Sequence, residues 1–366
     1  MSDGGLVAAI GVISGTSMDG IDVALIRSDG VSRVEAGPGA TYPYPADVAA
    51  ELRAVVADAR RAAGPLAALE AVVTDAHAAA VERFLAEFGV DRSAIALVGL
   101  HGQTVLHRPR ERVTRQLCDG ARAAAALELD VVNDFRSADV AAGGEGAPLV
   151  PLYHAAVAAA LDKPVMVLNW GGVGNVTYLG DAGEVVAFDT GPANALIDDF
   201  VARRLGLNRD EDGRLAAAGR ADAAIVAALT ADSYFDRAPP KSLDRNHFHA
   251  ALAAVEGLSD ADGAATLAAF TIEATAAASR HVAKPPTRWL VCGGGRRNPT
   301  LMKGLATRLA ARVEPIEAIG FDGDVVEAQC FAYLALRSRA GLPLSLPTTT
   351  GVPRPLTGGR FWPAAR

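Results

Sequence analysis

The chain has 366 residues, more than one hydrophobic core usually holds, so two domains are expected. Half of the residues are apolar, and the formal net charge of −7 argues against nucleic acid or an anionic membrane surface as a partner. The three cysteines (Cys118, Cys292 and Cys330) lack metal-ligand spacing and indicate reduced thiols in a cytoplasmic protein, and no apolar run approaches the roughly 20 residues of a membrane helix.

The first elements predict a hairpin. Two runs rich in β-branched residues, 6–13 and 21–26, predict strands, and residues 14–19 between them predict a tight turn. Glycine, threonine and serine at the tip of such a hairpin leave backbone N–H groups pointing outward, which suits phosphate oxygens. An ordinary surface hairpin explains this stretch equally well.

The next segments predict a layered α/β arrangement. A third strand is expected near 31–36, two helices over 46–88 with a break at Gly64–Pro65, and a short buried strand over 94–99. Three polar side chains follow that strand: His101, Gln103 and His107. Ligands bind at strand ends in α/β sheets, but a hydrogen-bonded loop is an equal alternative.

A helix over 116–126 and a strand at 131–132 lead into residues 133–151, which are too polar and glycine-rich for the interior of a regular element. This stretch predicts a long functional loop or a crossing between domains. Arg136 within it is suited to bind a carboxylate or a phosphate, and an interdomain salt bridge is the alternative.

The opening pattern recurs halfway along the chain. Residues 165–179 again place a glycine-rich turn between two apolar runs, as expected of an internal duplication. Two such hairpins facing each other would clamp a triphosphate. The following strand, 184–188, ends at Asp189, and Pro192 can open a helix over 196–205. Asp189 is therefore either a helix cap or a base held in a cleft, and from the residues alone capping is favoured.

The last third is largely helical. A polar loop at 239–248 could cover a ligand. A buried strand over 289–292 runs into three glycines before a helix that starts at residue 300, so the backbone can approach a ring or a phosphate there, although the spacing does not fit a dinucleotide fingerprint. In the final helix, 324–337, Glu327 is near the N-terminus, where a purely structural role is favoured.

Several stretches, taken together, resemble the anhydro-N-acetylmuramic acid kinases of the actin/Hsp70/sugar-kinase superfamily. The resemblance spans almost the whole chain and is carried by Gly15–Asp22, His101–Thr104, Asn133–Arg136, Gly143–Pro151, Asn169–Thr177, Phe188–Pro192 and Gly293–Asn298. It implies an α/β fold of two actin-like ATPase domains, with a duplicated β-β-β-α-β-α core and an interdomain cleft. The expected domains are 1–135 and 136–342, with the tail 343–366 packing back on the first.

The resemblance also implies a reaction. Such an enzyme hydrolyses the 1,6-anhydro bond of anhydro-N-acetylmuramic acid and phosphorylates O6 with ATP and Mg²⁺, in cytoplasmic peptidoglycan recycling, and it is expected to be a homodimer. Asp189 matches the family's base, which reverses the preference for capping. The expected substrate residues are His101, Gln103, Arg136 and Glu327. The expected nucleotide residues are Gly15, Thr16, Ser17, Met18, Asp19, Gly20, Ile21, Asp22, Asn169, Gly171, Gly172, Gly174, Asn175, Gly293, Gly294, Gly295 and Asn298.

The chain departs from the superfamily at two positions where an aspartate usually stands, Ile13 and Asn169. A Mg²⁺ site other than the usual aspartate-held one is therefore expected, with Asp19 as the metal ligand and Asp22 as the alternative. Two other functions compete with the anhydro-sugar kinase. One is an ordinary sugar kinase that acts on a free hydroxyl; the other is a nucleotide-gated binding module, which the lack of a leftover binding region argues against.

Overall fold

The computed structural model describes residues 5–15, 18 and 20–364, and its internal contacts divide the chain into two units. The first unit comprises Met1–Ala159 and Val325–Arg366, and the second comprises Ala160–Asp324. The expected boundaries at 135/136 and 342/343 differ from this division. Residues 136–159 and the last long helix belong to the first unit, because that helix packs on the first unit's sheet.

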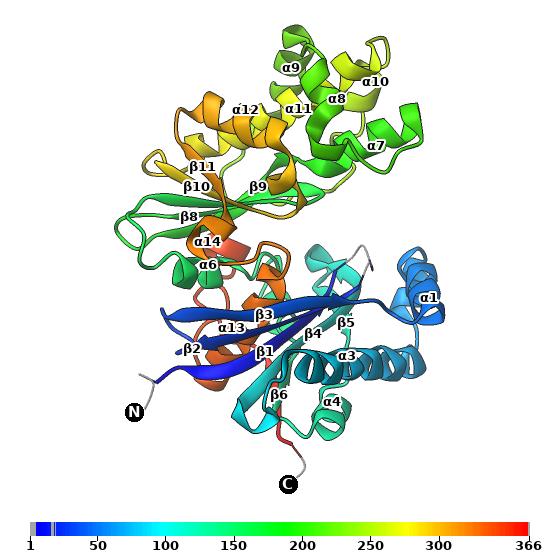
Figure 1. Ribbon diagram of the computed structural model, residues 1–366, viewed down its shortest axis with the longest axis vertical. Coiled ribbons are helices and arrows are strands. Elements are labelled where there is room, and N and C mark those ends of the chain that lie inside the picture. The colour runs from blue at the N-terminus through cyan, green and yellow to red at the C-terminus, as the bar shows by residue number, and fades with distance from the viewer. Residues whose placement is uncertain (1–4, 16–17, 19, 365–366) are drawn as a thin grey trace. The chain divides into compact units, whose positions relative to one another are not determined.

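The sheet of the first unit follows the order β12-β6-β4-β1-β2-β3, with β5 paired to β4 (Figure 1). Strands β1, β2 and β3 form an antiparallel meander. Strand β4 pairs in parallel with β1, and β6 pairs in parallel with β4. The strands are β1 (Val7–Ser14), β2 (Ile21–Ser28), β3 (Val34–Tyr42), β4 (Ile95–Arg108), β5 (Val113–Leu117), β6 (Val131–Asn133) and β12 (Arg360–Trp362).

The sheet of the second unit repeats this plan in the order β11-β10-β7-β8-β9. Strands β7, β8 and β9 again form an antiparallel meander, and β10 and β11 are added in parallel next to β7. The strands are β7 (Val165–Trp170), β8 (Val173–Leu179), β9 (Val185–Pro192), β10 (Arg288–Cys292) and β11 (Arg312–Pro315). The expected duplication is confirmed: β1 to β4 correspond to β7 to β10.

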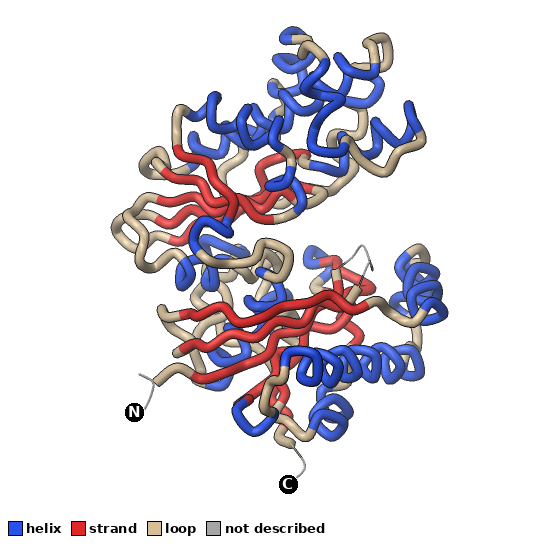
Figure 2. The backbone as a smooth tube through the Cα atoms, viewed as in Figure 1, coloured by secondary structure: helices blue, strands red, loops and turns tan. Residues whose placement is uncertain are grey.

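Helices cover the first sheet on both faces (Figure 2). Ile10 and Val12 belong to the apolar cluster with the helices of residues 46–127, whereas Gly11 between them faces α13. A Cβ at Gly11 would lie 1.8 Å from the carbonyl oxygen of Ala328, so glycine lets α13 approach the sheet closely. The helices are α1 (Ala46–Val56), α2 (Ala59–Ala63), α3 (Ala67–Phe88), α4 (Gly120–Leu127), α5 (Ser137–Ala141), α6 (Pro151–Val157), α13 (Val326–Arg339) and α14 (Pro347–Thr350).

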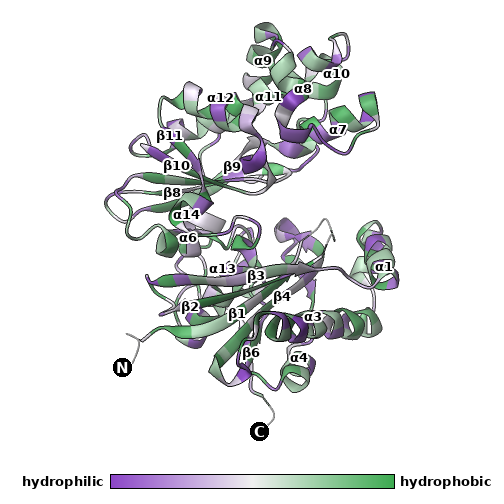
Figure 3. Ribbon diagram, viewed as in Figure 1, coloured by the Kyte–Doolittle hydropathy of each residue, from purple (hydrophilic) through white to green (hydrophobic). Residues whose placement is uncertain are grey.

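The second unit is built around α11, which packs against α7, α8, α9, α12 and strand β9. Apolar residues follow the strands of both sheets (Figure 3). Of the described helices, none has the length and apolar character needed to cross a membrane. The helices are α7 (Asn194–Leu205), α8 (Arg214–Ala218), α9 (Ala223–Thr230), α10 (Ala251–Ala254), α11 (Asp260–Ala277) and α12 (Pro299–Leu309).

Two strands differ from the expectation. The third strand begins at Val34 and runs to Tyr42 through a Gly-Pro-Gly segment, which is tolerated because β3 is an edge strand. Strand β4 does not stop at Gly99 but continues to Arg108, exchanging parallel pairing with β1 for antiparallel pairing with β5 at Gln103. His101, Gln103 and His107 therefore lie within a strand, and the expected loop is one arm of a hairpin.

Two helical predictions are also corrected. The segment 46–88 forms three helices rather than two, because Asp58 caps a separate helix, α2. The helix expected over 116–126 begins at Gly120, since residues 113–117 form β5 and Asp119 caps α4 through the backbone N–H of Arg122. The tail returns to the first sheet as expected, with β12 antiparallel to β6.

Candidate functional site

The hairpin β1–β2 carries the first glycine-rich turn. Its strands pair up to Ser14 and Ile21, and the backbone N–H of Met18 donates to the carbonyl of Gly15 at 3.1 Å. Gly20 packs tightly, because a Cβ there would lie 2.5 Å from the side chain of Thr41. Three expected nucleotide residues lie outside the described residues: Thr16, Ser17 and Asp19.

A buried hydrogen-bond chain supports this turn from below. The Nδ1 atom of His77 donates to the carbonyl of Val73 at 2.7 Å, so its Nε2 accepts from the hydroxyl of Ser14 at 3.2 Å. The hydroxyl of Tyr44 in turn donates to Ser14 at 2.7 Å. Burial lowers the pKa of His77 to about 4, and it is therefore neutral at physiological pH. The chain ties the start of the turn to α3.

Gln103 reaches the same turn from β4. Its side chain is fully buried, and its Nε2 donates to the carbonyls of Gly15 and Thr104, both at 3.2 Å. Two carbonyl partners fix the orientation of the amide, because a flipped amide would place oxygen against oxygen. Within the described residues, the Oε1 atom of Gln103 has no hydrogen-bond donor. It is a buried acceptor that the described residues leave unsatisfied.

His101 and Arg136 form a pair. Arg136 Nε donates to His101 Nε2 at 2.8 Å, and His101 Nδ1 donates to the carbonyl of Gly102 at 2.9 Å. Burial and the charge of Arg136 hold the pKa of His101 well below its ordinary value, so the neutral ring accepts from the guanidinium. The ring also packs on Phe331 of α13, with centroids 4.5 Å apart.

Arg136 is oriented by the loop that follows it. Its Nη1 donates to the carbonyl of Gly146 at 2.6 Å. The buried carboxylate of Asp139 fixes this loop by accepting from Gly146 N–H at 2.7 Å and from the hydroxyl of Thr350 at 2.6 Å. Sequence reasoning missed Asp139 and Thr350, because the two are more than 200 positions apart.

Glu327 lies in the first turn of α13, as expected, with an exposed side chain. Its negative charge raises the pKa of Arg136, against the larger lowering effect of burial on the guanidinium. Glu327, Arg136 and His101 are thus electrostatically coupled members of the first unit.

The second turn, between β7 and β8, is docked on the N-terminus of α7. Backbone N–H groups of Ala193 and Asn194 donate to the carbonyls of Gly172 and Gly171 at 3.2 and 3.0 Å. The amide of Asn194 donates to the carbonyl of Trp170 at 2.7 Å, and the Trp170 indole donates to Thr275 in the core at 3.0 Å. The turn is therefore held through its own backbone carbonyls and through the side chain of Trp170, which precedes it.

The glycines near this turn are of two kinds. A Cβ at Gly171 would have no neighbour closer than 3.8 Å, and one at Gly172 or Gly294 none closer than 3.5 Å. By contrast, Gly293 (φ +73°) would place a Cβ 2.3 Å from Asn169, and Gly295 would place one 2.5 Å from Trp170. At the first kind a Cβ would make only ordinary van der Waals contacts, whereas the second kind is required by packing.

Two other expected nucleotide residues have structural roles. The side chain of Asn298 caps α12 by accepting from the N–H groups of Thr300 and Leu301 at 3.0 and 3.1 Å. Gly174 would place a Cβ 2.6 Å from Thr190 Oγ1, so its hydrogen is needed for packing.

A polar row crosses the second sheet. Asn169 on β7 pairs with Asn175 on β8, and Asn175 pairs with Asp189 on β9. Residues that pair directly across strands point to the same face, so the three side chains share one face of the sheet. The duplicate row in the first sheet reads Ile13, Asp22 and Thr41, where Thr41 donates to Asp22 at 2.6 Å.

Asp189 is held by three hydrogen bonds from outside its strand. Leu243 N–H donates to its Oδ2 at 2.8 Å, its own N–H donates to the carbonyl of Lys241 at 3.0 Å, and the Tyr234 hydroxyl donates to its carbonyl at 2.7 Å. The capping alternative is wrong: α7 begins at Asn194, and no side chain caps it. Asp189 lies inside β9, as does Pro192, which does not open the helix. Sequence reasoning assigned the loop 239–248 to a ligand but missed its contact with Asp189.

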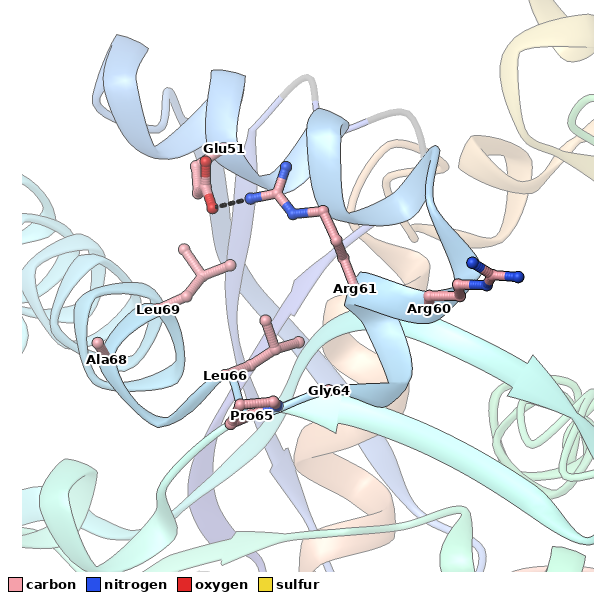
Figure 4. A pocket seen from close by; sticks show the side chains of 8 residues that line it. All are labelled: Glu51, Arg60, Arg61, Gly64, Pro65, Leu66, Ala68 and Leu69. Atoms are coloured by element: carbon pink, nitrogen blue, oxygen red, sulfur yellow. Dashed lines mark hydrogen bonds and ion pairs between the residues drawn. The ribbon is translucent and has the colours of Figure 1, made fainter.

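Two cavities of the first unit are lined by described residues that lie outside its own glycine turn. Arg61 and Glu51 close one side of the first, at the junction of α1, α2 and α3, while Arg60 points away (Figure 4). The second, of about 370 Å³, contains His101 at one wall. Among the residues described, no three His, Cys, Asp or Glu side chains gather in a way that could hold a metal ion.

Comparisons with known proteins identify the family. A family model described as anhydro-N-acetylmuramic acid kinase matches residues 7–364. A protein of that name from Rhodospirillum rubrum is 53% identical over 363 residues, 99% of this chain and 96% of that protein. Another, from Rhizorhabdus wittichii, is 51% identical over 96% of this chain and 97% of its own length.

Solved structures support the fold alone. Component A of (R)-2-hydroxyglutaryl-CoA dehydratase from Acidaminococcus fermentans is 12% identical, with a TM-score of 0.50 over 91% of this chain and 99% of that one. Together with the duplicated sheets, this confirms the predicted two-domain actin-like ATPase fold. The family match covers nearly the whole sequence at about half identity, and the chain therefore belongs to the anhydro-N-acetylmuramic acid kinase family.

Proposed function

We propose that this kinase opens the 1,6-anhydro bridge of 1,6-anhydro-N-acetylmuramic acid with water and transfers the γ-phosphoryl group of ATP to O6. The products are N-acetylmuramic acid 6-phosphate and ADP. The observation that carries the proposal is Asp189, whose carboxylate caps no helix and is instead oriented by the N–H of Leu243. Such a fixed, half-buried carboxylate is suited to act as a general base.

The substrate's chemistry requires only one base. O6 carries no proton while it is bonded to C1, so it is a poor nucleophile. When water attacks C1, the C1–O6 electron pair moves to O6, and Asp189 takes the proton of the water. O6 then attacks the γ-phosphorus in line and ADP leaves. The phosphoryl group captures the leaving oxygen, so the general acid of an ordinary inverting glycosidase is not needed.

The two glycine turns are proposed to bind ATP. Gly171, Gly172 and Gly294 support this because a Cβ at any of them would make only ordinary van der Waals contacts, the nearest at 3.5 Å, so close packing with protein does not require glycine there. In the first turn, residues Gly15 to Asp22 are proposed to bind the nucleotide. The hydrogen bond that Gln103 donates to the carbonyl of Gly15 supports this, because it holds the start of the turn in place. Gly293 and Gly295 shape the neighbouring backbone by close packing, and Asn298 shapes it by capping α12.

Mg²⁺ is proposed to bind through the nucleotide phosphates and few protein groups, as is usual for this ion. The donor set fits weakly, because Ile13 offers no ligand and Asn169 offers a neutral amide in the polar row. Asp19 remains the proposed carboxylate ligand, with Asp22 near it in sequence. Bound there, Mg²⁺ would neutralise phosphate charge.

The sugar is proposed to contact His101, Gln103, Arg136 and Glu327. Gln103 Oε1 is suited to accept from a hydroxyl or an amide N–H, and Arg136 is suited to the lactyl carboxylate. A cytoplasmic place in peptidoglycan recycling agrees with the three reduced, buried cysteines. A homodimer is proposed from the resemblance, and light scattering of the purified protein tests it.

The variant Asp189→Asn tests the base. Asparagine keeps the size and can still accept from Leu243 N–H, but it cannot take a proton. We expect the variant to fold and bind ATP, yet to lose about 10² to 10⁴ in turnover of the anhydro sugar, measured as ADP and opened sugar.

The matched control is Asp222→Asn, since Asp222 caps α9 and asparagine caps a helix equally well. It should turn over normally. Near-normal turnover by Asp189→Asn would show that Asp189 is not the base. An ordinary kinase acting on a free hydroxyl is not favoured by the family match, and it predicts that N-acetylmuramic acid outperforms the anhydro sugar.

A further inference from the structure

Lys241 is a buried lysine in the loop 239–248, with 6% of its surface exposed. Its Nζ donates to the carbonyl of Tyr234 at 3.0 Å and approaches the carbonyl of Phe235 at 3.5 Å. The ammonium also lies over the rings of Tyr234 and Phe188, 4.6 and 5.7 Å from their centroids. It therefore ties the loop to the Tyr234–Phe235 segment.

Those two segments are also the ones that hold Asp189. The Lys241 carbonyl accepts from Asp189 N–H, Leu243 N–H donates to the carboxylate, and the Tyr234 hydroxyl donates to the Asp189 carbonyl. Leu243 N–H contacts the carboxylate of Asp189 and the Tyr234 hydroxyl contacts its backbone carbonyl. A shift of the loop relative to Tyr234 would therefore move the carboxylate's donor while the backbone of Asp189 stayed with Tyr234. The position of the carboxylate thus depends on the distance between the segments that Lys241 joins.

The two carbonyls that Lys241 contacts do not need it as a donor. The Tyr234 carbonyl also accepts from Arg237 N–H at 3.2 Å, and the Phe235 carbonyl accepts from His281 Nε2 at 2.7 Å. Because a carbonyl only accepts, His281 Nε2 carries a proton, and its 3.4 Å contact with Nζ is not a hydrogen bond. Burying an ammonium is costly, so satisfying these acceptors does not explain a lysine here.

We propose that Lys241 is a positioning residue, whose ammonium clamps the 239–248 loop against Tyr234 so that Leu243 N–H fixes the carboxylate of Asp189 for proton transfer. The inference rests on the proposed function of Asp189. Hydrogen bonds from a charged donor are roughly twice as strong as neutral ones, and the aromatic faces add cation–π attraction. The single buried ammonium of a lysine supplies both the charged hydrogen bond and the cation–π attraction.

The charges around Lys241 make the clamp sensitive to pH. Burial and, to a smaller extent, the charges of Arg237 and Arg280 lower the pKa of Lys241 to about 8, against the opposing effect of Asp236 and Asp189. His281, which also contacts Nζ, has a pKa lowered by burial and stays neutral in this range. Above about pH 8 the amine loses its charge, so the clamp weakens and turnover should fall.

The test compares Lys241→Met with Lys303→Met, a change at an exposed lysine on α12. Methionine fills the site without a donor or a charge. We expect kcat to fall about 10- to 100-fold, as for a base displaced by about 1 Å, with the Kd of an ATP analogue unchanged and thermal stability unchanged or raised. The alkaline decline of kcat near pH 8 should disappear in Lys241→Met and persist in Lys303→Met.

The proposal would be overturned if Lys241→Met kept kcat within twofold of the wild-type value and still showed the decline of kcat near pH 8. If Lys241→Met does not fold, the wild-type profile decides, because a constant kcat from pH 7 to pH 9.5 contradicts the clamp. Inactive Asp189→Asn combined with fully active Lys241→Met would refute the clamp alone, whereas active Asp189→Asn would refute the base itself.

Discussion

At the scale of residues, the glycines in and near the second turn are of two kinds: some are required by close packing, and at others a Cβ would make only ordinary contacts. Gly293 and Gly295 approach Asn169 and Trp170 so closely that any side chain would displace them. Gly171 has no such neighbour, although its carbonyl is fixed by Asn194 N–H. A rigid turn with a bare surface is what close approach of phosphate oxygens requires.

The variant Gly171→Val should therefore fold and selectively weaken nucleotide binding. We expect the Kd of an ATP analogue to rise about tenfold or more, which is about 1.4 kcal/mol, with little change for the anhydro sugar. Calorimetric titration with each ligand measures this. Gly257→Val is the control, since a Cβ at Gly257 would have no neighbour within 4 Å. Equal losses for both ligands would point to a structural role for Gly171.

Residue roles could be predicted only where local sequence determines them. The glycine turns and Asp189 stand in motifs that can be read directly, but the choice between cap and base could not be made from Phe188 to Asn194. The deciding contact comes from Leu243, 54 positions away. For the same reason, sequence reasoning missed Lys241 and Asp139, whose partners are brought near by the fold.

At the scale of elements, the first hairpin depends on α3. His77 of that helix links Val73 to Ser14 and, through Ser14, to Tyr44. In this chain of hydrogen bonds, Tyr44 donates to Ser14, Ser14 to His77 and His77 to the carbonyl of Val73, which requires a neutral imidazole. Strand β4 shows the limit of sequence reasoning here: its extension past Gly99 depends on pairing with β5, which a local pattern does not reveal.

Acid should destabilise the protein through His77. Its pKa is about 4 in the folded protein and about 6.5 when unfolded, so between these values the unfolded chain binds more protons. The free energy of unfolding should thus fall as pH drops from about 6.5 to about 4, at up to about 1.4 kcal/mol per pH unit for this group.

Urea unfolding of wild type and His77→Asn at pH 7, 6, 5 and 4.5 measures this effect. The variant begins less stable but should lose less with each step. Buried His154, whose pKa burial alone lowers, contributes equally to both proteins and cancels in the comparison. Burial and Arg136 lower the pKa of His101 more than His77 does, so most of its contribution cancels as well. Parallel pH curves would show that His77 is not titrated in this way.

At the scale of the whole molecule, the chain is one plan used twice with different chemistry. The matching row reads Ile13, Asp22 and Thr41 in the first sheet and Asn169, Asn175 and Asp189 in the second. The duplication could be predicted because both hairpins recur with similar composition. The division of the chain could not, because α13 joins the first sheet through Gly11 and Gly99, far apart in sequence.

In the proposed mechanism, ring opening and phosphorylation are one event, with Asp189 activating water at C1. Reaction of the anhydro sugar with ATP in ¹⁸O-water, followed by mass spectrometry of the products, distinguishes this event from attack of water on phosphorus. We expect one ¹⁸O at C1 of N-acetylmuramic acid 6-phosphate and none in its phosphate. Label in the phosphate group would show that water attacks phosphorus and would contradict the coupled mechanism.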